Sequence, residues 1–268
     1  MRDNRAILTH IQMTIARADT IDGLVKGLAV LESFDTERQR LNATQTAERA
    51  GLTRAAARRH LLTLAHLGYL ETDGSHYWLS PRVLRFSGAY LASARLPRVI
   101  QPTLNRLAAE TQDAYSAVVL DSDEVVIVAR GAGAGPVTRM LAYGMHLGAR
   151  LPAHATSTGR VLLAALPQDE LAEWLAGRVL PRLTPRTTTG LREFKALLAE
   201  VAEKDYCVAS EEHELGVHAV AVPLRNPQGR VVAALNVIVS PGHLQETSQL
   251  ERALERLRNA ARELRQML

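Results

Sequence analysis

The stretch of residues 42–70 constrains this chain more than any other, because it carries the signals of two short helices joined by a tight turn. Asn42 or Thr44 can cap the first helix, and Gly51 suits a turn position that needs a positive φ. Thr53 can accept a hydrogen bond from one of the free amides at the start of the second helix. The stretch therefore predicts a helix-turn-helix.

The second predicted helix has an apolar side and a basic side. Ala57, Leu61 and Leu64 are spaced at i, i+4 and i+7 and are expected to pack inward. Arginines on its first turn and opposite side are typical of a helix that enters a DNA groove. They would also suit the solvated face of an ordinary surface helix. The residues expected to contact DNA, two of them from the hairpin that follows, are Thr44, Thr53, Arg54, Ala55, Ala56, Arg58, Arg59, Ser75 and His76.

A short hairpin is predicted directly after these helices. Residues 71–79 contain two short β-prone runs around a polar turn that includes Gly74. A helix-turn-helix followed at once by a hairpin is a winged helix, and its wing can reach the phosphate backbone beside the groove.

The distribution of charge favours the DNA-binding interpretation. The first 98 residues carry 14 Lys and Arg against 9 Asp and Glu, whereas the remaining 170 carry 18 against 19. The excess positive charge thus lies on the segment that would meet DNA. Only 4% of the residues are aromatic, which leaves few stacking platforms for single strands. The expected partner is therefore double-stranded promoter DNA.

The remaining composition points to a cytoplasmic protein. A single cysteine, Cys207, excludes an intramolecular disulfide framework and suits a reducing compartment. No apolar run is long enough to span a bilayer, and residues 1–18 lack the pattern of a signal peptide. We therefore expect no membrane association.

Four segments are predicted along the chain: an N-terminal arm (1–19), a winged helix-turn-helix domain (20–80), a linker helix (81–98) and a second domain (99–268). The linker helix is expected to run from Pro81 toward Pro97, and it could equally be the last helix of the DNA-binding domain. The first helix of that domain should turn one apolar stripe toward the two helices that follow. This stripe consists of Ile21, Leu24, Val25, Leu28, Leu31 and Phe34.

The second domain is predicted to be an antiparallel α+β domain, because strand pairs joined by hairpin turns are separated by helices. Strands are expected at residues 114–120, 125–130, 207–210, 219–224 and 231–239. Helices are expected at residues 100–111, 156–166, 168–175, 190–204 and 244–267.

Two segments of small residues in this domain have alternative interpretations. Residues 131–135 alternate Gly and Ala, but they lack the Gly-Lys-Ser/Thr ending of a phosphate-binding loop and precede a strand-like run, so an inter-strand loop is expected. Residues 156–158 begin a helix with small polar side chains, which either cap that helix or hold a carboxylate.

The sequence contains no catalytic constellation, so we expect no enzyme activity, no cofactor and no metal site. The densest ionisable cluster is residues 211–214 with His218, and its two histidines are five apart, so they do not share a helical face as zinc ligands would. Cys207 has no neighbouring base and is expected to be a buried thiol. The alternative is a metal-dependent sensor or enzyme with a metal at His213 and His218.

Several segments together give the chain a resemblance to the IclR family of bacterial transcription regulators over residues 21–268. They are GLAVLESF (27–34), LTRAAARRHLLTLAHLGYL (52–70), RLPAHATSTGRVLLA (150–164), and residues 206–236 with EEHELG and AVPLRN. LPAHATSTGRVLLA and LTPRTTT look most like the branch that regulates aromatic-acid catabolism, the PcaR, PcaU and PobR group.

The resemblance implies an N-terminal winged helix-turn-helix, a linker helix and a C-terminal GAF-like α/β effector-binding domain with an antiparallel sheet. It also implies a homodimer, or a dimer of dimers, on a palindromic promoter site. Arg59 matches a position where the family usually has arginine on the recognition helix. Asp205 departs from the usual glycine before Tyr206.

An effector pocket is likewise implied by the resemblance. Ala209 stands where glyoxylate-responsive relatives are acidic, and the mostly apolar set suits a small aromatic carboxylate better than a very polar two-carbon acid. The residues matched to the family pocket are Met140, Tyr143, Leu151, Ser157, Thr158, Ala209, Val217, Ala219, Asn236 and Ile238.

The expected function is a ligand-responsive regulator that controls an aromatic-acid catabolic operon, such as one for protocatechuate or 4-hydroxybenzoate in the β-ketoadipate pathway. RNA polymerase is a further expected partner. The alternatives are a family member that responds to a non-aromatic carboxylate, the metal-dependent sensor or enzyme, and an architectural DNA binder without an effector. Activation and repression are both compatible with the sequence.

Overall fold

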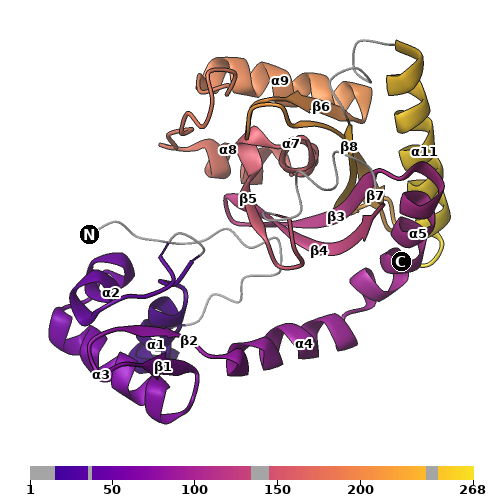
Figure 1. The fold of residues 1–268 in the computed structure, drawn as a ribbon. Coiled ribbons are helices and arrows are strands. Elements are labelled where there is room, and N and C mark those ends of the chain that lie inside the picture. Colours follow the sequence, from indigo (N-terminus) through magenta and orange to yellow (C-terminus); the bar gives the residue numbers. More distant parts are fainter. Residues whose placement is uncertain (1–15, 36–37, 134–144, 240–246) are drawn as a thin grey trace. The chain divides into compact units, whose positions relative to one another are not determined.

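The computed structural model describes residues 16–35, 38–133, 145–239 and 247–268, and the chain divides into two compact units (Figure 1). One unit spans Met13–Ala92, and the other contains Ser93–Leu268. Most of the predicted arm lies outside the described residues. None of the helices in the described ranges is long and apolar enough to cross a bilayer.

The first unit contains the predicted helix-turn-helix, formed by α2 (Ala43–Ala50) and α3 (Arg54–His66). Of the two candidate caps of α2, Asn42 fills the position: its side chain accepts hydrogen bonds from the amides of Thr44 and Gln45, both at 3.0 Å. Gln45 Oε1 accepts in return from the Asn42 amide at 3.0 Å, which completes a capping box. Gly51 ends α2 with a φ of 66°, so the turn uses the left-handed conformation that favours glycine.

The predicted hairpin follows α3. Strands β1 (Leu70–Thr72) and β2 (Tyr77–Leu79) pair antiparallel, and the turn between them contains Gly74. Tyr77 also pairs with Leu41 through two backbone hydrogen bonds of 2.9 and 3.0 Å, which ties the hairpin to the segment before α2. The small core beneath consists of Val30, Phe34, Leu41, Leu61, Leu70 and Tyr77.

The prediction for the first helix, α1 (Asp22–Leu31), is wrong for most of its apolar stripe. Phe34 and, in part, Leu31 reach the core, together with Val30, which lies about 200° around the helix from Leu28. The rest of the stripe is exposed: Ile21 by 70%, Leu24 by 60%, Val25 by 54% and Leu28 by 50%. A helical period reveals that an apolar face exists, but it does not say what covers that face.

The predicted linker helix is interrupted. A 3₁₀ turn at Pro81–Val83 leads into α4 (Leu84–Ser93), and Ala94, in extended conformation with ψ of 126°, separates it from α5 (Arg95–Thr111). Pro97 therefore lies in the first turn of α5 and does not end the preceding helix. That position tolerates proline because the first amides of a helix lack intrahelical partners.

The second unit is built on one antiparallel sheet with strand order β5-β4-β3-β8-β7-β6, which confirms the predicted α+β class. The predicted strands appear with small shifts at their ends, and the short β5 is an addition. The strands are β3 (Ala114–Asp121), β4 (Glu124–Ala132), β5 (Arg150–Pro152), β6 (Cys207–Ser210), β7 (His218–Arg225) and β8 (Val231–Val239).

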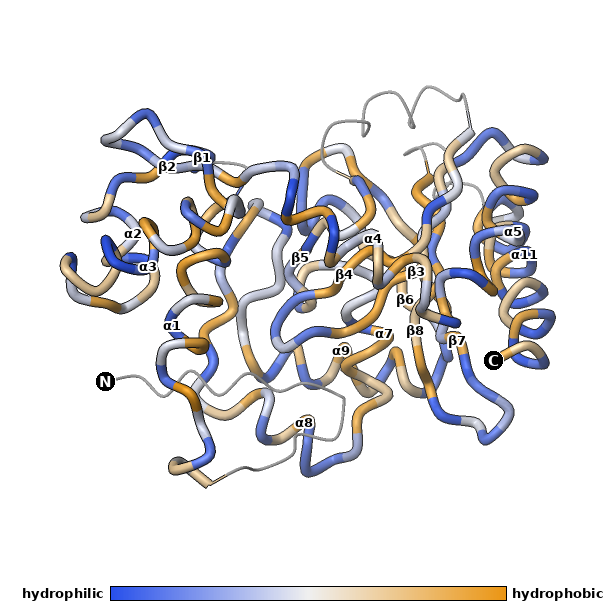
Figure 2. The backbone as a smooth tube through the Cα atoms, turned by 90° about the horizontal axis from the view of Figure 1, so that it is seen from below, coloured by the Kyte–Doolittle hydropathy of each residue, from blue (hydrophilic) through white to orange (hydrophobic). Residues whose placement is uncertain are grey.

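Helices cover both faces of this sheet (Figure 1). On one face, α5 and α11 (Thr247–Arg265) pack on alternate strand residues such as Tyr115 and Val237. Blue and orange alternate along these two helices in Figure 2, as expected where one side meets the sheet and the other meets solvent. On the other face the sheet curves around α7 (Ser157–Ala164), with α8 (Gln168–Leu175) and α9 (Leu191–Lys204) in the same core.

The predicted loop at residues 131–135 is partly a strand, because β4 continues through Ala132. Gly131 is required there by a close approach: a Cβ at this position would lie 2.2 Å from the carbonyl oxygen of Leu104 on α5. Residues 134 and 135 and the strand-like run after them lie outside the described residues.

Candidate functional site

The start of α3, with its N-cap, carries six of the nine predicted DNA-contacting residues, while Thr44 lies on α2 and Ser75 and His76 lie in the hairpin turn. Thr53 Oγ1 accepts a hydrogen bond from the Ala56 amide at 3.2 Å and so caps the helix. Ala57 and Leu61 are fully buried beneath it, whereas Thr44, Thr53, Arg54, Ala55, Arg58 and Arg59 are exposed. Within the described ranges, none of the three arginines forms an ion pair, so their guanidinium groups are available for phosphate or base edges.

The tip of the hairpin is organised by Asp73, which the sequence analysis did not single out. Its carboxylate accepts hydrogen bonds from the amides of His76 at 2.8 Å and Ser75 at 2.9 Å, and from the Ser75 hydroxyl at 3.0 Å. These bonds lower the pKa of Asp73 to about 2, so the tip carries a negative charge at neutral pH. Ser75 and His76 thus lie beside a carboxylate, and their contact with DNA stays a prediction.

Arg40, in the segment before α2, offers positive charge beside the same hairpin. Its guanidinium lies 4.0 Å from the ring centroid of Trp78 and 3.8 Å from the Asp73 carboxylate. Trp78 in turn donates a hydrogen bond from Nε1 to Glu71 at 2.9 Å. The face of an aromatic ring attracts a cation, so this contact positions the arginine beside the wing.

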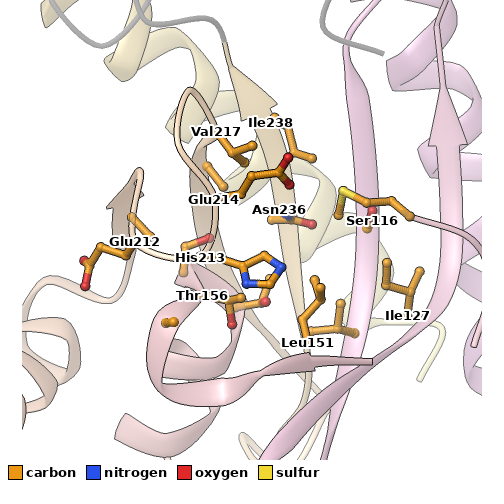
Figure 3. A pocket seen from close by; sticks show the side chains of 17 residues that line it. Ser116, Ile127, Leu151, Thr156, Glu212, His213, Glu214, Val217, Asn236 and Ile238 are labelled. Atoms are coloured by element: carbon orange, nitrogen blue, oxygen red, sulfur yellow. The ribbon is translucent and has the colours of Figure 1, made fainter. Parts of the chain in front are cut away.

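The second unit contains a pocket of about 240 Å³ between the sheet, the start of α7 and the loop of residues 211–217 (Figure 3). Among the residues matched to the family pocket, Met140 and Tyr143 lie outside the described residues, and the other eight line the cavity. The described lining consists of Ser116, Val118, Ile127, Met145, Leu151, Ala155, Thr156, Ser157, Thr158, Ala209, Glu212, His213, Glu214, Val217, Ala219, Asn236 and Ile238.

The start of α7 supplies the polar end of this pocket. Thr156 Oγ1 caps the helix by accepting from the Gly159 amide at 3.2 Å, while Ser157 and Thr158 are almost fully buried and line the cavity. Thr156 is therefore the helix cap, and a role of Ser157 and Thr158 in holding a carboxylate stays a prediction. A helix start with free amides and two hydroxyls is chemically suited to a carboxylate.

Of the loop that closes the pocket, the sequence analysis placed only Val217 in the lining and missed Glu212, His213 and Glu214. Glu211 adopts a φ of 58°, and the chain then passes through Glu212, His213 and Glu214 before β7 begins. This irregular loop has no period from which its direction could be predicted. Ser116 did leave a signal, since it is a polar residue in an otherwise apolar strand.

A buried ion pair fixes this loop. Arg160 on α7 is fully buried and forms two hydrogen bonds to the Glu212 carboxylate, which also accepts from the Thr188 amide at 3.0 Å. Burial would raise the pKa of Glu212, but Arg160 and Thr188 outweigh it and hold the pKa below its ordinary value. The Glu212 carboxylate points away from the centre of the cavity (Figure 3).

Unlike Glu212, the two histidines and the cysteine near the pocket have pKa values shifted toward their neutral forms. Burial lowers the pKa of His213 and of His154, whose Nε2 lies 3.0 Å from the carbonyl oxygen of Pro181. Cys207 is buried as expected, and burial raises the pKa of its thiol to about 11. In the described part of the chain, no group of three His, Cys, Asp or Glu is placed to hold a metal ion.

Comparison with known families and proteins assigns both units. Residues 23–74 match the IclR helix-turn-helix domain, and residues 88–266 match the C-terminal domain of bacterial transcriptional regulators of the IclR type. The chain is 50% identical over 265 residues to the Pca operon regulatory protein of Acinetobacter baylyi, covering 99% of this chain and 93% of that protein. It is 51% identical over 260 residues to the p-hydroxybenzoate hydroxylase transcriptional activator of the same species, covering 97% and 96%.

A solved structure adds a ligand-bound relative. A double mutant of the PobR inducer-binding domain from Acinetobacter, in complex with 3-hydroxybenzoic acid, is 48% identical with a TM-score of 0.58. The match covers 64% of this chain and 98% of that one. Together with the two domain matches and the two relatives, it identifies this chain as a member of the IclR family, a DNA-binding transcription regulator and not an enzyme.

Proposed function

We propose that this protein is a homodimeric regulator that binds a palindromic promoter site through paired α3 helices and responds to a small aromatic carboxylate in the pocket of the second unit. The regulated genes are those of an aromatic-acid catabolic operon, for protocatechuate or 4-hydroxybenzoate. The observation that carries the proposal is the pocket itself, which is mostly apolar and has hydrogen-bond donors at one end.

The size and lining of the pocket support an aromatic acid. A cavity of about 240 Å³ is smaller than the roughly 300–1,000 Å³ of drug-sized sites, and so suits a single ring with few substituents. Val118, Ile127, Leu151 and Ile238 offer flat apolar contact, while Ser157 and Thr158 offer hydroxyl donors for the carboxylate. The printed names of the two Acinetobacter relatives refer to the pca operon and to p-hydroxybenzoate, and the PobR domain holds 3-hydroxybenzoic acid.

Exposed apolar residues in the first unit support a dimer. Ile21 and three residues of α1 leave an apolar face open to solvent, and on α4 Leu84 and Phe86 are exposed by 64% and 62%. A water-soluble unit of this size rarely exposes so many large apolar side chains unless another molecule covers them. A second copy is the natural occupant, since a single recognition helix per chain needs a partner to read a palindrome.

Effector control requires that the ligand bind two arrangements of the dimer unequally, because otherwise it shifts no equilibrium. The change would alter the spacing of the two α3 helices and hence operator affinity. If the outcome is activation, contact with RNA polymerase is the step that follows DNA binding.

A thermal-shift panel combined with promoter binding tests the proposal. Protocatechuate and 4-hydroxybenzoate should raise the melting temperature of the full chain and change its affinity for the promoter beside its own gene, measured by fluorescence anisotropy. Glyoxylate serves as the non-aromatic control. Stabilisation by glyoxylate alone, or by none of the acids at millimolar concentration, would contradict an aromatic effector.

A further inference from the structure

Asn236 is an unsatisfied polar residue in the floor of the pocket. It lies on β8, is 6% exposed, and lines the cavity. Its Oδ1 atom is buried and accepts no hydrogen bond from the described part of the chain. Buried amide oxygens are nearly always hydrogen-bonded in folded proteins, so an unpaired one on a residue that lines a cavity indicates a missing donor.

The surroundings of Asn236 make that unpaired atom costly. On the sheet, Asn236 pairs with Ser116 of β3 on one side and Ala221 of β7 on the other. Ile238, two residues along β8, and Ala219 of β7 are apolar members of the same lining. Figure 3 shows the side chains of Asn236, Ser116 and His213 in the same cavity, coming from β8, β3 and the 211–217 loop. A ligand that donates a hydrogen bond to Oδ1 therefore supplies the bond that this atom lacks in the free protein, and that bond favours binding.

The chemistry of an acceptor atom selects which end of the ligand it can face. A carboxylate has no proton to donate at neutral pH, so its oxygens would be repelled by Oδ1. A phenolic O–H is a donor and fits. The carboxylate instead suits the start of α7, where Ser157 and Thr158 supply donors. The two ends of the pocket thus differ in hydrogen-bonding character. The start of α7 offers donors, and Asn236 on the sheet offers an acceptor.

We propose that Asn236 reads a ring hydroxyl of the effector through Oδ1, so that hydroxylated aromatic acids bind and benzoates without a ring donor are rejected. This inference rests on the function proposed above. A site built to accept from a hydroxyl discriminates strongly against analogues that lack one, because the buried acceptor is left unpaired in their complexes.

The experiment compares matched ligands on the wild-type full chain by isothermal titration calorimetry. Each of 3- and 4-hydroxybenzoate is paired with the fluorobenzoate of the same position, which has similar size and no donor. In at least one pair the hydroxyl compound should bind roughly tenfold to a hundredfold more tightly. The corresponding aminobenzoate, whose N–H also donates, should retain much of that advantage.

The outcomes separate this inference from the proposed function. If the hydroxy and fluoro compounds bind equally in both pairs, Asn236 does not read a hydroxyl, although the pocket still holds an aromatic acid. If no aromatic acid binds at all, the proposed function fails and this inference fails with it.

Variants of the two sheet residues give the residue-level test. Asn236→Leu removes the acceptor and should abolish the preference by weakening the hydroxybenzoate while leaving or improving fluorobenzoate binding. A merely structural role would weaken both ligands equally, which would overturn the inference. Ser116→Ala keeps Oδ1 and should keep most of the preference. Circular dichroism checks folding, and if Asn236→Leu does not fold, the wild-type ligand pairs still decide.

Discussion

Arg160 and Glu212 form a bidentate ion pair behind the pocket, with only 1% of the arginine side chain and 12% of the glutamate side chain exposed. Arg160 Nε also donates to the carbonyl oxygen of His154 at 2.9 Å. The hydroxyl of Thr187 donates to the carbonyl oxygen of Glu212 at 2.7 Å, and Thr188 donates to its carboxylate. One ion pair therefore joins α7, the segment before α9 and the loop that closes the pocket.

Replacing one partner should destabilise the second unit. Glu212→Gln would leave the Arg160 charge buried without its counter-ion, at a cost of about 3–5 kcal/mol, which corresponds to a melting temperature lowered by about 10 °C. Differential scanning calorimetry measures the change. Glu173→Gln, on the exposed side of α8, is the matched control and should shift the melting temperature by only about 1–2 °C. If Glu212→Gln lowered the melting temperature no more than Glu173→Gln, the ion pair would contribute nothing to stability.

Acid should remove the contribution of this pair. The folded pKa of Glu212 lies below its ordinary value of 4.5, because the charge and hydrogen bonds of Arg160 outweigh the effect of burial. The stabilisation is therefore complete above about pH 4.5 and is lost as the pH falls through the lower folded pKa. Melting curves of the wild type and Glu212→Gln should differ most near pH 6 and converge toward pH 3. A gap that stays constant over this range would contradict the assignment.

Removal of one arginine from α3 should weaken DNA binding. Arg59→Ala deletes an exposed cation from the recognition surface, and if that group contacts phosphate, the slope of log affinity against log salt should fall by about 1. Fluorescence anisotropy with the promoter at several salt concentrations gives both quantities. Arg192→Ala, an exposed arginine on α9, is the control and should leave them unchanged. Unaltered affinity in Arg59→Ala would exclude this side chain from the contact surface.

A charge on the open face of α1 should separate the dimer. Leu28 is 50% exposed, so Leu28→Glu should leave the fold of the unit intact while burying a charge in any interface formed there. We expect a shift toward monomer in sedimentation velocity and promoter binding weakened roughly tenfold or more. Lys26→Glu places a glutamate elsewhere on the helix, loses only an exposed ion pair with Asp22 and should preserve the dimer. If both variants remain dimeric, the dimer contact does not lie on this face of α1.

Replacing the aspartate at the end of α9, Asp205, by glycine should change the free energy of unfolding very little. Asp205 has a φ of 59°, and its carboxylate accepts two hydrogen bonds from Arg225 at 2.6 and 2.8 Å. Asp205→Gly relieves a conformation that costs other residues about 1 kcal/mol, but it loses an exposed ion pair of about 0.2–1 kcal/mol. Urea unfolding should thus show little change for Asp205→Gly and a loss of about 1 kcal/mol for Asp205→Ala. A large loss in the glycine variant would mean that the ion pair dominates.

Local chemistry made much of the fold predictable from the sequence. Asn42, Gly51 and Thr53 act at short range, so their capping and turn roles could be read directly and are confirmed. The α1 stripe was predicted wrongly, because the side chains that cover a helix come from distant segments or from another molecule. Ala94 was likewise missed, since alanine carries no signal for a helix break.

The pocket was predictable where a motif or strand fixed the residue, and not where a loop did. Ser157, Thr158 and Asn236 were matched through the family resemblance, and each lines the cavity. His213 was weighed only as a metal ligand, because the loop that turns it toward the cavity has no periodic pattern. Met140 and Tyr143 lie outside the described residues, so their place in the pocket stays a prediction.

Along the central strand β8, successive side chains point to opposite faces of the sheet. On β8, Asn236 and Ile238 line the proposed effector pocket, while Val237 between them packs in the core beneath α5 and α11. Successive residues of this strand therefore alternate between the proposed pocket and the core. Substitutions at every second position of such a strand can therefore change which ligand the pocket accepts, without disturbing the core on the opposite face of the sheet.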